Sequence, residues 1–177
     1  VQSALVRSVW GQQGRYTTLQ LAQYAATLAN KGKRPKPIFV EKIESFDGKV
    51  LQTFEGTILN EINIPMEYWE VIEKGMEQVS KGGFEGFPYR VAAKTGTSTQ
   101  SVGGKEVDNA VFIAYAPVED PVLAVAVVVP EGGYGAWGAA PIARHIFDAY
   151  DRKVGLTGTP NPNAPLYIEK SQPDEGQ

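Results

Sequence analysis

Cysteine is absent from the sequence, and histidine occurs once, at position 145. Without cysteine the protein has no disulfide, no thiolate nucleophile and no cysteine-bound zinc, and a single histidine does not make a structural zinc site. We therefore expect no metal and no other cofactor. Basic residues are not in excess either, because the formal net charge is -3 at pH 7. Binding a phosphate backbone needs a basic surface, so nucleic acid is not an expected partner.

Long hydrophobic runs are also missing. The longest one, at residues 122–129, is far too short to cross a bilayer as a helix. Neither a signal peptide nor an initiating methionine is present, since the sequence begins at Val1, and we expect a piece of a longer protein. With 177 residues, of which 42% are hydrophobic, the chain is long enough to bury one sizeable core, and a single domain is predicted.

Two amphipathic helices and a hairpin are predicted in the first half of the chain. Apolar residues at helical spacing predict helices over residues 18–31 and 65–81. Between them, the Asp47-Gly48 pair predicts a small peripheral hairpin over residues 37–54. The stripes expected to be buried are Leu21, Tyr24, Ala25 and Leu28 in the first helix, and Met66, Trp69, Ile72, Met76 and Val79 in the second.

Three strands are predicted next, over residues 89–99, 109–116 and 122–129. The last two are apolar at odd and even positions alike, so both of their faces should be covered, and the short link "PVED" between them favours an antiparallel pair. A third helix is predicted over residues 137–154 and a loose tail over residues 156–177. The residues of this helix expected to face the sheet are Ile142, Ile146, Tyr150 and Val154. The predicted fold class is α+β, an antiparallel sheet flanked by helices, with residues 1–155 in the domain.

The stretch "VAAKTGTSTQ" at residues 91–100 places a lysine, a glycine and several hydroxyls on the first predicted strand. Alternation sends Lys94 and Gly96 to one face of a regular strand and both threonines to the other, so one site can use all four only at a sheet edge. Unpaired backbone groups at such an edge can bind an extended peptide. Lys94 offers a positive charge for a carboxylate or a proton transfer, and Gly96 leaves room for a ligand. Thr95 and Thr97 offer hydroxyl donors, and a backbone N–H beyond the glycine can stabilise an oxyanion.

A purely structural role for these residues stays open at this point. Threonine is a normal strand former, and a lysine on an edge strand is a common guard against aggregation. The context favours a functional role, because small residues precede the Lys-Thr-Gly-Thr run and two antiparallel strands and a helix are predicted after it.

With its surroundings, this run resembles the transpeptidase domain of class B penicillin-binding proteins. "KTGT" at residues 94–97 is similar to the third signature of the penicillin-recognising serine acyl-enzymes. "GQQGRYTTLQLAQYAATLANKGKRPKP" at residues 11–37 resembles the Gly-rich turn and following helix of the family, with Thr18 where a proline often stands. "NAVFIAYAPVEDPVLAVAVVVPEGG" at residues 109–133 resembles the two strands after the signature. Together these stretches extend the resemblance over residues 8–155.

The resemblance implies a D,D-transpeptidase that cross-links peptidoglycan, in which a serine attacks a D-Ala-D-Ala stem peptide or a β-lactam and forms an acyl-enzyme. It implies catalytic roles for Lys94, next to the serine of the second signature, and for Thr97, whose backbone N–H would form half of the oxyanion hole. The implied substrate-binding residues are Lys94, Thr95, Gly96 and Thr97, with the threonines holding the substrate carboxylate. The implied location is the extracytoplasmic face of a bacterial cell membrane, through an N-terminal anchor absent here.

The other two family signatures, Ser-x-x-Lys and Ser-x-Asn, occur nowhere in the 177 residues. Both precede the third signature in the family, so we expect this chain to be the C-terminal part of the domain, inactive without the missing N-terminal part. A sheet edge left uncovered by that missing part predicts self-association of the fragment. Two alternatives remain open: a β-lactamase or β-lactam sensor domain, and a non-catalytic peptide-binding module.

The remaining polar and aromatic features receive structural interpretations. His145 lies off the apolar stripe of its helix and is expected to be solvated. Tyr134 and Trp137 can border a substrate groove, but helix entry or core packing is the preferred interpretation. The residues expected to form the solvated face of the helix at 65–81 are Glu70, Glu73, Lys74 and Glu77.

Overall fold

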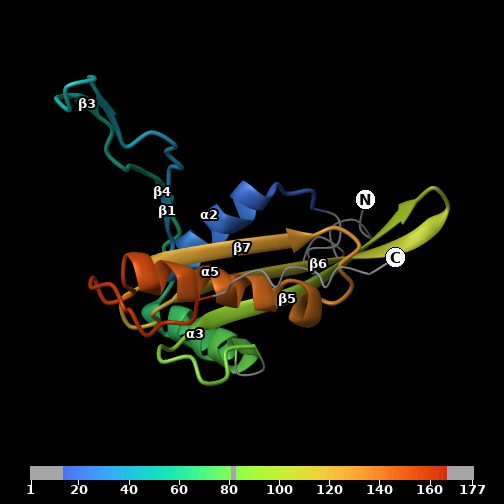
Figure 1. Cartoon of the computed structure of the whole chain (residues 1–177). Coiled ribbons are helices and arrows are strands. Elements are labelled where there is room, and N and C mark those ends of the chain that lie inside the picture. Colours follow the sequence, from blue (N-terminus) through green and yellow to red (C-terminus); the bar gives the residue numbers. More distant parts are fainter. Residues whose placement is uncertain (1–13, 81–82, 167–177) are drawn as a thin grey trace, which may run out of the picture.

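The computed structural model describes residues 14–80 and 83–166, whose centre is a three-stranded antiparallel sheet in the order β5–β6–β7. Helices α2 and α3 cover one face of this sheet and α5 covers the other, which confirms the predicted α+β class (Figure 1). The elements in chain order are α2 (Thr18–Ala29), β1 (Lys33–Pro35), β2 (Lys42–Glu44), β3 (Val50–Thr53), β4 (Ile58–Glu61), α3 (Met66–Ser80), β5 (Ala92–Val102), β6 (Lys105–Ala116), β7 (Leu123–Val129), α4 (Gly135–Gly138) and α5 (Ala140–Lys153).

The core lies on both sides of the sheet. Phe112 of β6 packs with Phe147 of α5 on one face, whereas Ile113 and Tyr115 pack with Trp69 of α3 on the other. This arrangement confirms that the apolar central strands are covered on both faces. β6 and β7 pair antiparallel, as their short connection predicts.

The β5–β6 hairpin is longer than the sequence predicts. Strand β5 runs to Val102, and β6 begins at Lys105. Between them Gly103 and Gly104 have φ angles of 59° and 81°, which glycine adopts at no steric cost and which a two-residue hairpin turn requires. The strand predicted at residues 89–99 begins and ends three residues before β5, and the one predicted at residues 109–116 lacks the first four residues of β6. The distal half of the hairpin is missed because it is polar and shows no apolar alternation.

Helix α2 begins at a capping box. The Thr17 side chain accepts a hydrogen bond from the Gln20 N–H at 3.2 Å, and the Gln20 side chain accepts one from the Thr17 N–H at 2.9 Å. Of the stripe predicted for α2, Ala25 and Leu28 are buried, but Tyr24 is exposed. Residues 11–13 of the family-like turn, and residues 81–82 at the predicted end of the next helix, lie outside the described residues.

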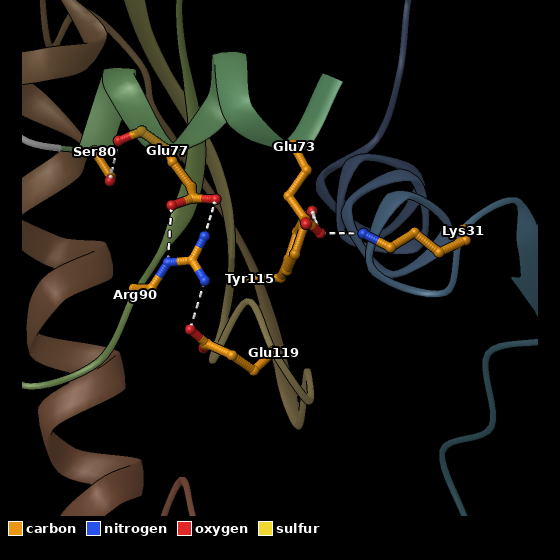
Figure 2. Close-up of polar contacts among 7 residues, drawn as sticks. All are labelled: Lys31, Glu73, Glu77, Ser80, Arg90, Tyr115 and Glu119. Carbon is orange, nitrogen blue, oxygen red and sulfur yellow. Dashed lines mark hydrogen bonds and ion pairs between the residues drawn. The ribbon is translucent and has the colours of Figure 1, made fainter. Parts of the chain in front are cut away.

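The stripe predicted for α3 is only partly buried. Trp69 and Met76 lie in the core, whereas Met66 and Ile72 are exposed. Glu73 was expected on the solvated face of this helix, and that prediction is wrong. Its carboxylate pairs with Lys31 at the end of α2 and accepts a hydrogen bond from the hydroxyl of the buried Tyr115 at 3.2 Å (Figure 2). Burial and this carboxylate raise the pKa of Tyr115 above its ordinary value.

Glu77, one turn further along α3, is likewise paired. Arg90 donates two hydrogen bonds to its carboxylate, at 3.0 and 2.5 Å, and a third to Glu119 at 2.7 Å (Figure 2). These two carboxylates raise the pKa of the Arg90 guanidinium. Helix α3 therefore presents part of its polar side to the sheet and to the β6–β7 connection, and it leaves Glu70 and Lys74 exposed.

The buried face of α5 differs from the predicted one. Ile142, Ile146 and Val154 are 40–49% exposed, and only Tyr150 of the predicted stripe packs against the core. The residues of α5 that pack in the core with the sheet are Ala140, Ala143 and Phe147, and Asp148 and Asp151 are buried as well. Two alanines let the helix approach the sheet closely, so the larger isoleucines point outward.

The segment after α5 is packed, so the predicted loose tail is wrong for residues 156–166. Leu156 and Ala164 are buried. The buried carboxylate of Asp151 accepts hydrogen bonds from the Leu156 N–H at 2.9 Å and from the Asn161 side chain at 2.8 Å. Residues 167–177 of the predicted tail lie outside the described residues.

An arm formed by residues 33–61 extends from the body between α2 and α3 (Figure 1). It consists of two antiparallel two-stranded sheets, β1–β4 next to the body and β2–β3 at the far end. The hairpin predicted over residues 37–54 is β2–β3, with the turn at Asp47-Gly48. Among the described helices, none combines the length and the hydrophobicity that a membrane span needs.

Candidate functional site

A cavity of about 460 Å³ opens beside strand β5. One wall is the Lys-Thr-Gly-Thr run, and the other is the start of α4 with the residue before it. The lining residues are Lys94, Thr95, Gly96, Thr97, Tyr134, Gly135, Ala136 and Trp137. The four residues singled out in the sequence thus meet at one cavity although their side chains alternate along the strand.

The position of β5 in the sheet explains how both faces of the strand contribute. β5 pairs with β6 on one side, with Gly96 opposite Val111 and Thr97 opposite Ala110. Within the part of the chain that the structure describes, no strand pairs with its other side. An extended ligand can therefore reach unpaired backbone groups as well as the side chains of the run.

Lys94 and Thr97 are exposed, and Thr95 and Gly96 are half-buried. The Lys94 ammonium donates a hydrogen bond to the carbonyl oxygen of Thr95 at 2.6 Å. This contact keeps the charge beside the strand, at the wall of the cavity. A positive charge and two hydroxyls in an open cleft form a suitable site for a carboxylate.

Gly135 sets the distance between the two walls. A Cβ atom at this position would lie 2.3 Å from the carbonyl oxygen of Val111 and 2.5 Å from that of Gly96. The start of α4 therefore rests directly on the backbone of the Lys-Thr-Gly-Thr strand, which only glycine permits. The loop before α4 is held by hydrogen bonds from the Gly133 N–H to the Asp108 carbonyl oxygen at 3.0 Å and from the Glu131 N–H to the Asn109 side chain at 3.1 Å.

Tyr134 and Trp137 were underestimated by the sequence interpretation. Tyr134 does stand at helix entry, as the N-cap residue of α4. Core packing is wrong for both rings, since Tyr134 is 66% and Trp137 81% exposed, and both line the cavity. The alternation of glycines with aromatics in "GGYGAWG" was the available signal, because glycines allow close backbone packing that leaves large side chains no room in the core.

Other chemistry has little support at this site. Over residues 14–80 and 83–166, no group of three His, Cys, Asp or Glu side chains is placed to hold a metal ion. His145 is exposed on α5, away from the residues that line the cavity. The arrangement is therefore suited to binding an anionic, extended ligand against a strand edge, with two aromatic rings opposite.

Comparison with known proteins gives a consistent set of relatives. The family model described as "Penicillin binding protein transpeptidase domain" matches residues 1–148. The chain is 34% identical over 163 residues to penicillin-binding protein 2B of Streptococcus pneumoniae, covering 83% of this chain and 24% of that protein. It is 34% identical over 155 residues to the peptidoglycan D,D-transpeptidase MrdA of Haemophilus influenzae, covering 76% of this chain and 23% of that protein.

Solved structures show the same similarity. Penicillin-binding protein 2B of S. pneumoniae superposes with a TM-score of 0.73 at 33% identity, over 82% of this chain and 26% of that one. Penicillin-binding protein A of M. tuberculosis, as a penicillin G acyl-enzyme complex, superposes with a TM-score of 0.67 at 28% identity, over 76% of this chain and 32% of that one. The chain spans about a quarter of the length of the two sequence relatives.

Proposed function

Because the chain belongs to the penicillin-binding protein transpeptidase domain family, we propose that it is the part of a serine D,D-transpeptidase that carries the Lys-Thr-Gly-Thr strand of the active site. The parent enzyme cross-links peptidoglycan stem peptides ending in D-Ala-D-Ala and is acylated by β-lactams. It acts at the extracytoplasmic face of a bacterial membrane. The observation that carries the proposal is that residues 94–97 line one cavity along an unpaired strand edge.

Each residue of the run has a task in this chemistry. The ammonium of Lys94 attracts the terminal carboxylate of the stem peptide, or that of a β-lactam, and supports proton transfer to and from the attacking serine. The hydroxyls of Thr95 and Thr97 donate hydrogen bonds to the same carboxylate. Gly96 leaves space for the ligand backbone, and the backbone N–H of Thr97 donates to the oxyanion of the tetrahedral intermediate.

The nucleophile must come from outside these residues. No serine of the chain has a lysine three positions later, so none is paired with a general base in the manner of the family's first signature. Residues 1–177 therefore bind without forming an acyl-enzyme, and the serine with its lysine belongs to the remaining part of the transpeptidase domain.

The test is labelling with a fluorescent penicillin, read by intact mass, on this chain and on a longer protein that contains the complete domain. We expect one adduct on the longer protein and none on the chain. An adduct on the chain would show an unrecognised nucleophile. A longer protein without an adduct would favour a peptide-binding module, and rapid release of the adduct by hydrolysis would favour a β-lactamase.

A matched pair of variants in the longer protein tests the role of the strand. Thr97→Val removes one charge-assisted hydrogen bond to the carboxylate and should slow acylation about 10- to 100-fold. Thr99→Val makes the same substitution one alternation further along β5. It removes the hydrogen bond from the Thr99 hydroxyl to Asp108 at 2.6 Å, but it lies outside the residues that line the cavity and should leave the rate unchanged. Equal rates for the two variants would refute the assignment of Thr97 to the ligand.

A further inference from the structure

The far end of the arm has the character of an interaction surface. Every residue of β2 and β3 is exposed. Large apolar side chains are nevertheless frequent there, with Phe46 fully exposed, Phe39 83% and Leu51 62% exposed. Several exposed large apolar side chains on one short arm are typical of a surface that another molecule covers.

The β2–β3 sheet also lacks the partners that stabilise a hairpin. Over residues 14–80 and 83–166 it has two strands, and an isolated two-stranded hairpin is marginally stable in water. Among the described residues, no strand pairs with the outer edge of β2, so its outward backbone groups remain available to a further strand. A third strand added at this edge would stabilise the arm.

The sequence of β2 is complementary to itself. When two copies of Lys42-Ile43-Glu44 run antiparallel with Ile43 opposite Ile43, each lysine stands opposite a glutamate of the other copy. If the antiparallel pair is centred on residue 42 instead, Lys42 stands opposite Lys42, and if it is centred on residue 44, Glu44 stands opposite Glu44. A parallel pair in register would bring both like-charged pairs together. Opposite charges thus select one arrangement, and it has two-fold symmetry.

From this we infer that the arm is a self-association surface, in which the β2 edges of two copies pair antiparallel about Ile43 and form a four-stranded sheet. Within one copy, the Lys42 ammonium donates to the Glu44 carboxylate at 2.7 Å, so both side chains lie on one face of the strand. In the pair, each charge gains a second partner across the two-fold axis. The inference does not depend on the proposed enzymatic function.

The charges of the arm argue against a membrane or a nucleic acid as the covering molecule. Over the whole arm, residues 33–61, five basic side chains balance five carboxylates, and the far end at residues 38–54 has two lysines against three carboxylates. An arm without a basic excess offers an anionic surface no net attraction. A second copy meets both requirements of the edge, since it supplies apolar side chains and alternating charges.

The test is sedimentation of this chain at concentrations from about 10 µM to 1 mM, because so short an edge should give a weak dimer with a dissociation constant on the order of 100 µM. The wild type should dimerise reversibly. Lys42→Glu alone should remain monomeric, since glutamates then face each other, and so should Glu44→Lys alone, since lysines then face each other. An equimolar mixture of the two variants should form a heterodimer, and the double variant K42E/E44K should dimerise like the wild type.

A control separates pairing from net charge. Lys49→Glu makes the same charge change as Lys42→Glu on the same arm but outside β2, and it should leave the dimer intact. Recovery in the mixture shows that each single variant keeps a folded arm. A wild type that stays monomeric at 1 mM, single variants that dimerise as the wild type does, or a mixture that remains monomeric would each overturn the inference.

Discussion

Replacing Gly135 by alanine tests the close contact between the two walls of the cavity. The new Cβ would meet three backbone atoms, at 2.3 Å from the Val111 oxygen and at 2.5 and 3.0 Å from the oxygen and nitrogen of Gly96. Gly96 and Val111 are register partners in the β5–β6 pair, so neither can move without disturbing the sheet. Helix α4 must shift instead, by the order of 1 Å, to restore ordinary van der Waals distances.

The expected cost is at the upper end for overpacking. Extra atoms in a packed site cost about 1–3 kcal/mol, and three contacts with backbone rather than flexible side chains place Gly135→Ala near 3 kcal/mol. For a chain of this size, each kcal/mol lowers the melting temperature by about 2–4 °C. We therefore expect a loss of roughly 6–12 °C in thermal unfolding followed by circular dichroism.

Gly75→Ala is the matched control. Gly75 is exposed within α3, and a Cβ there would meet nothing within 4 Å. Because alanine favours the helix over glycine, this variant should gain about 0.5–1 kcal/mol. If Gly135→Ala melted at the wild-type temperature while Gly75→Ala behaved as expected, the direct contact of α4 with the Lys-Thr-Gly-Thr strand would be refuted.

Three further substitutions have distinct expected results. Asp151→Ala leaves three donors, including the Tyr89 hydroxyl at 2.9 Å, without their buried acceptor. The free energy of unfolding, measured in urea, should therefore fall by roughly 3–5 kcal/mol. A fall of less than about 1 kcal/mol would contradict the packing of residues 156–166. Burial and Glu73 raise the pKa of Tyr115, so above about pH 10 the unfolded state releases a proton that the folded state keeps. The stability of the wild type should therefore fall as the pH rises, and Tyr115→Phe should make this fall smaller. An equal fall for both proteins between pH 9 and 11 would count against this. Trp137→Ala, at an exposed position, should change the melting temperature by less than about 2 °C and slow acylation of the longer protein, whereas unchanged acylation would exclude the ring from ligand binding.

The strand that carries the site could be predicted from the sequence because its signals are local. Two-sided apolar strands, a short connection and a Lys-Thr-Gly-Thr run are all contiguous patterns, and an edge position followed from the need to bring Lys94 and Thr97 to one ligand. The opposite wall depends instead on a contact distant in sequence, between Gly135 and Gly96. The sequence interpretation therefore preferred helix entry or core packing for Trp137 over a place at the groove, whereas the ring is exposed beside the cavity.

Helix α5 shows why periodicity failed in one place. Its isoleucines form a regular stripe, but Ala143 and Phe147 occupy the face that touches the sheet. Two aspartates of the helix are also buried, and a pattern of hydrophobic residues does not reveal a buried carboxylate. Asp151 is retained there because it binds the segment that follows the helix, which the sequence interpretation treated as loose.

The outer edges of β5 and β2, both unpaired among the described residues, differ in a way that separates the two proposals. The outer edge of β5 carries an exposed lysine and hydroxyl side chains. Two copies of this edge would bring lysines together and would leave the hydroxyls bound to water, so a carboxylate ligand suits the edge better than a second copy. The outer edge of β2 carries Lys42 and Glu44 around an isoleucine and is complementary to its own copy. The arm end lies away from the strand that forms the cavity wall (Figure 1). Lys42→Glu should therefore abolish the dimer without changing acylation of the longer protein, and Thr97→Val should slow acylation without changing the dimer.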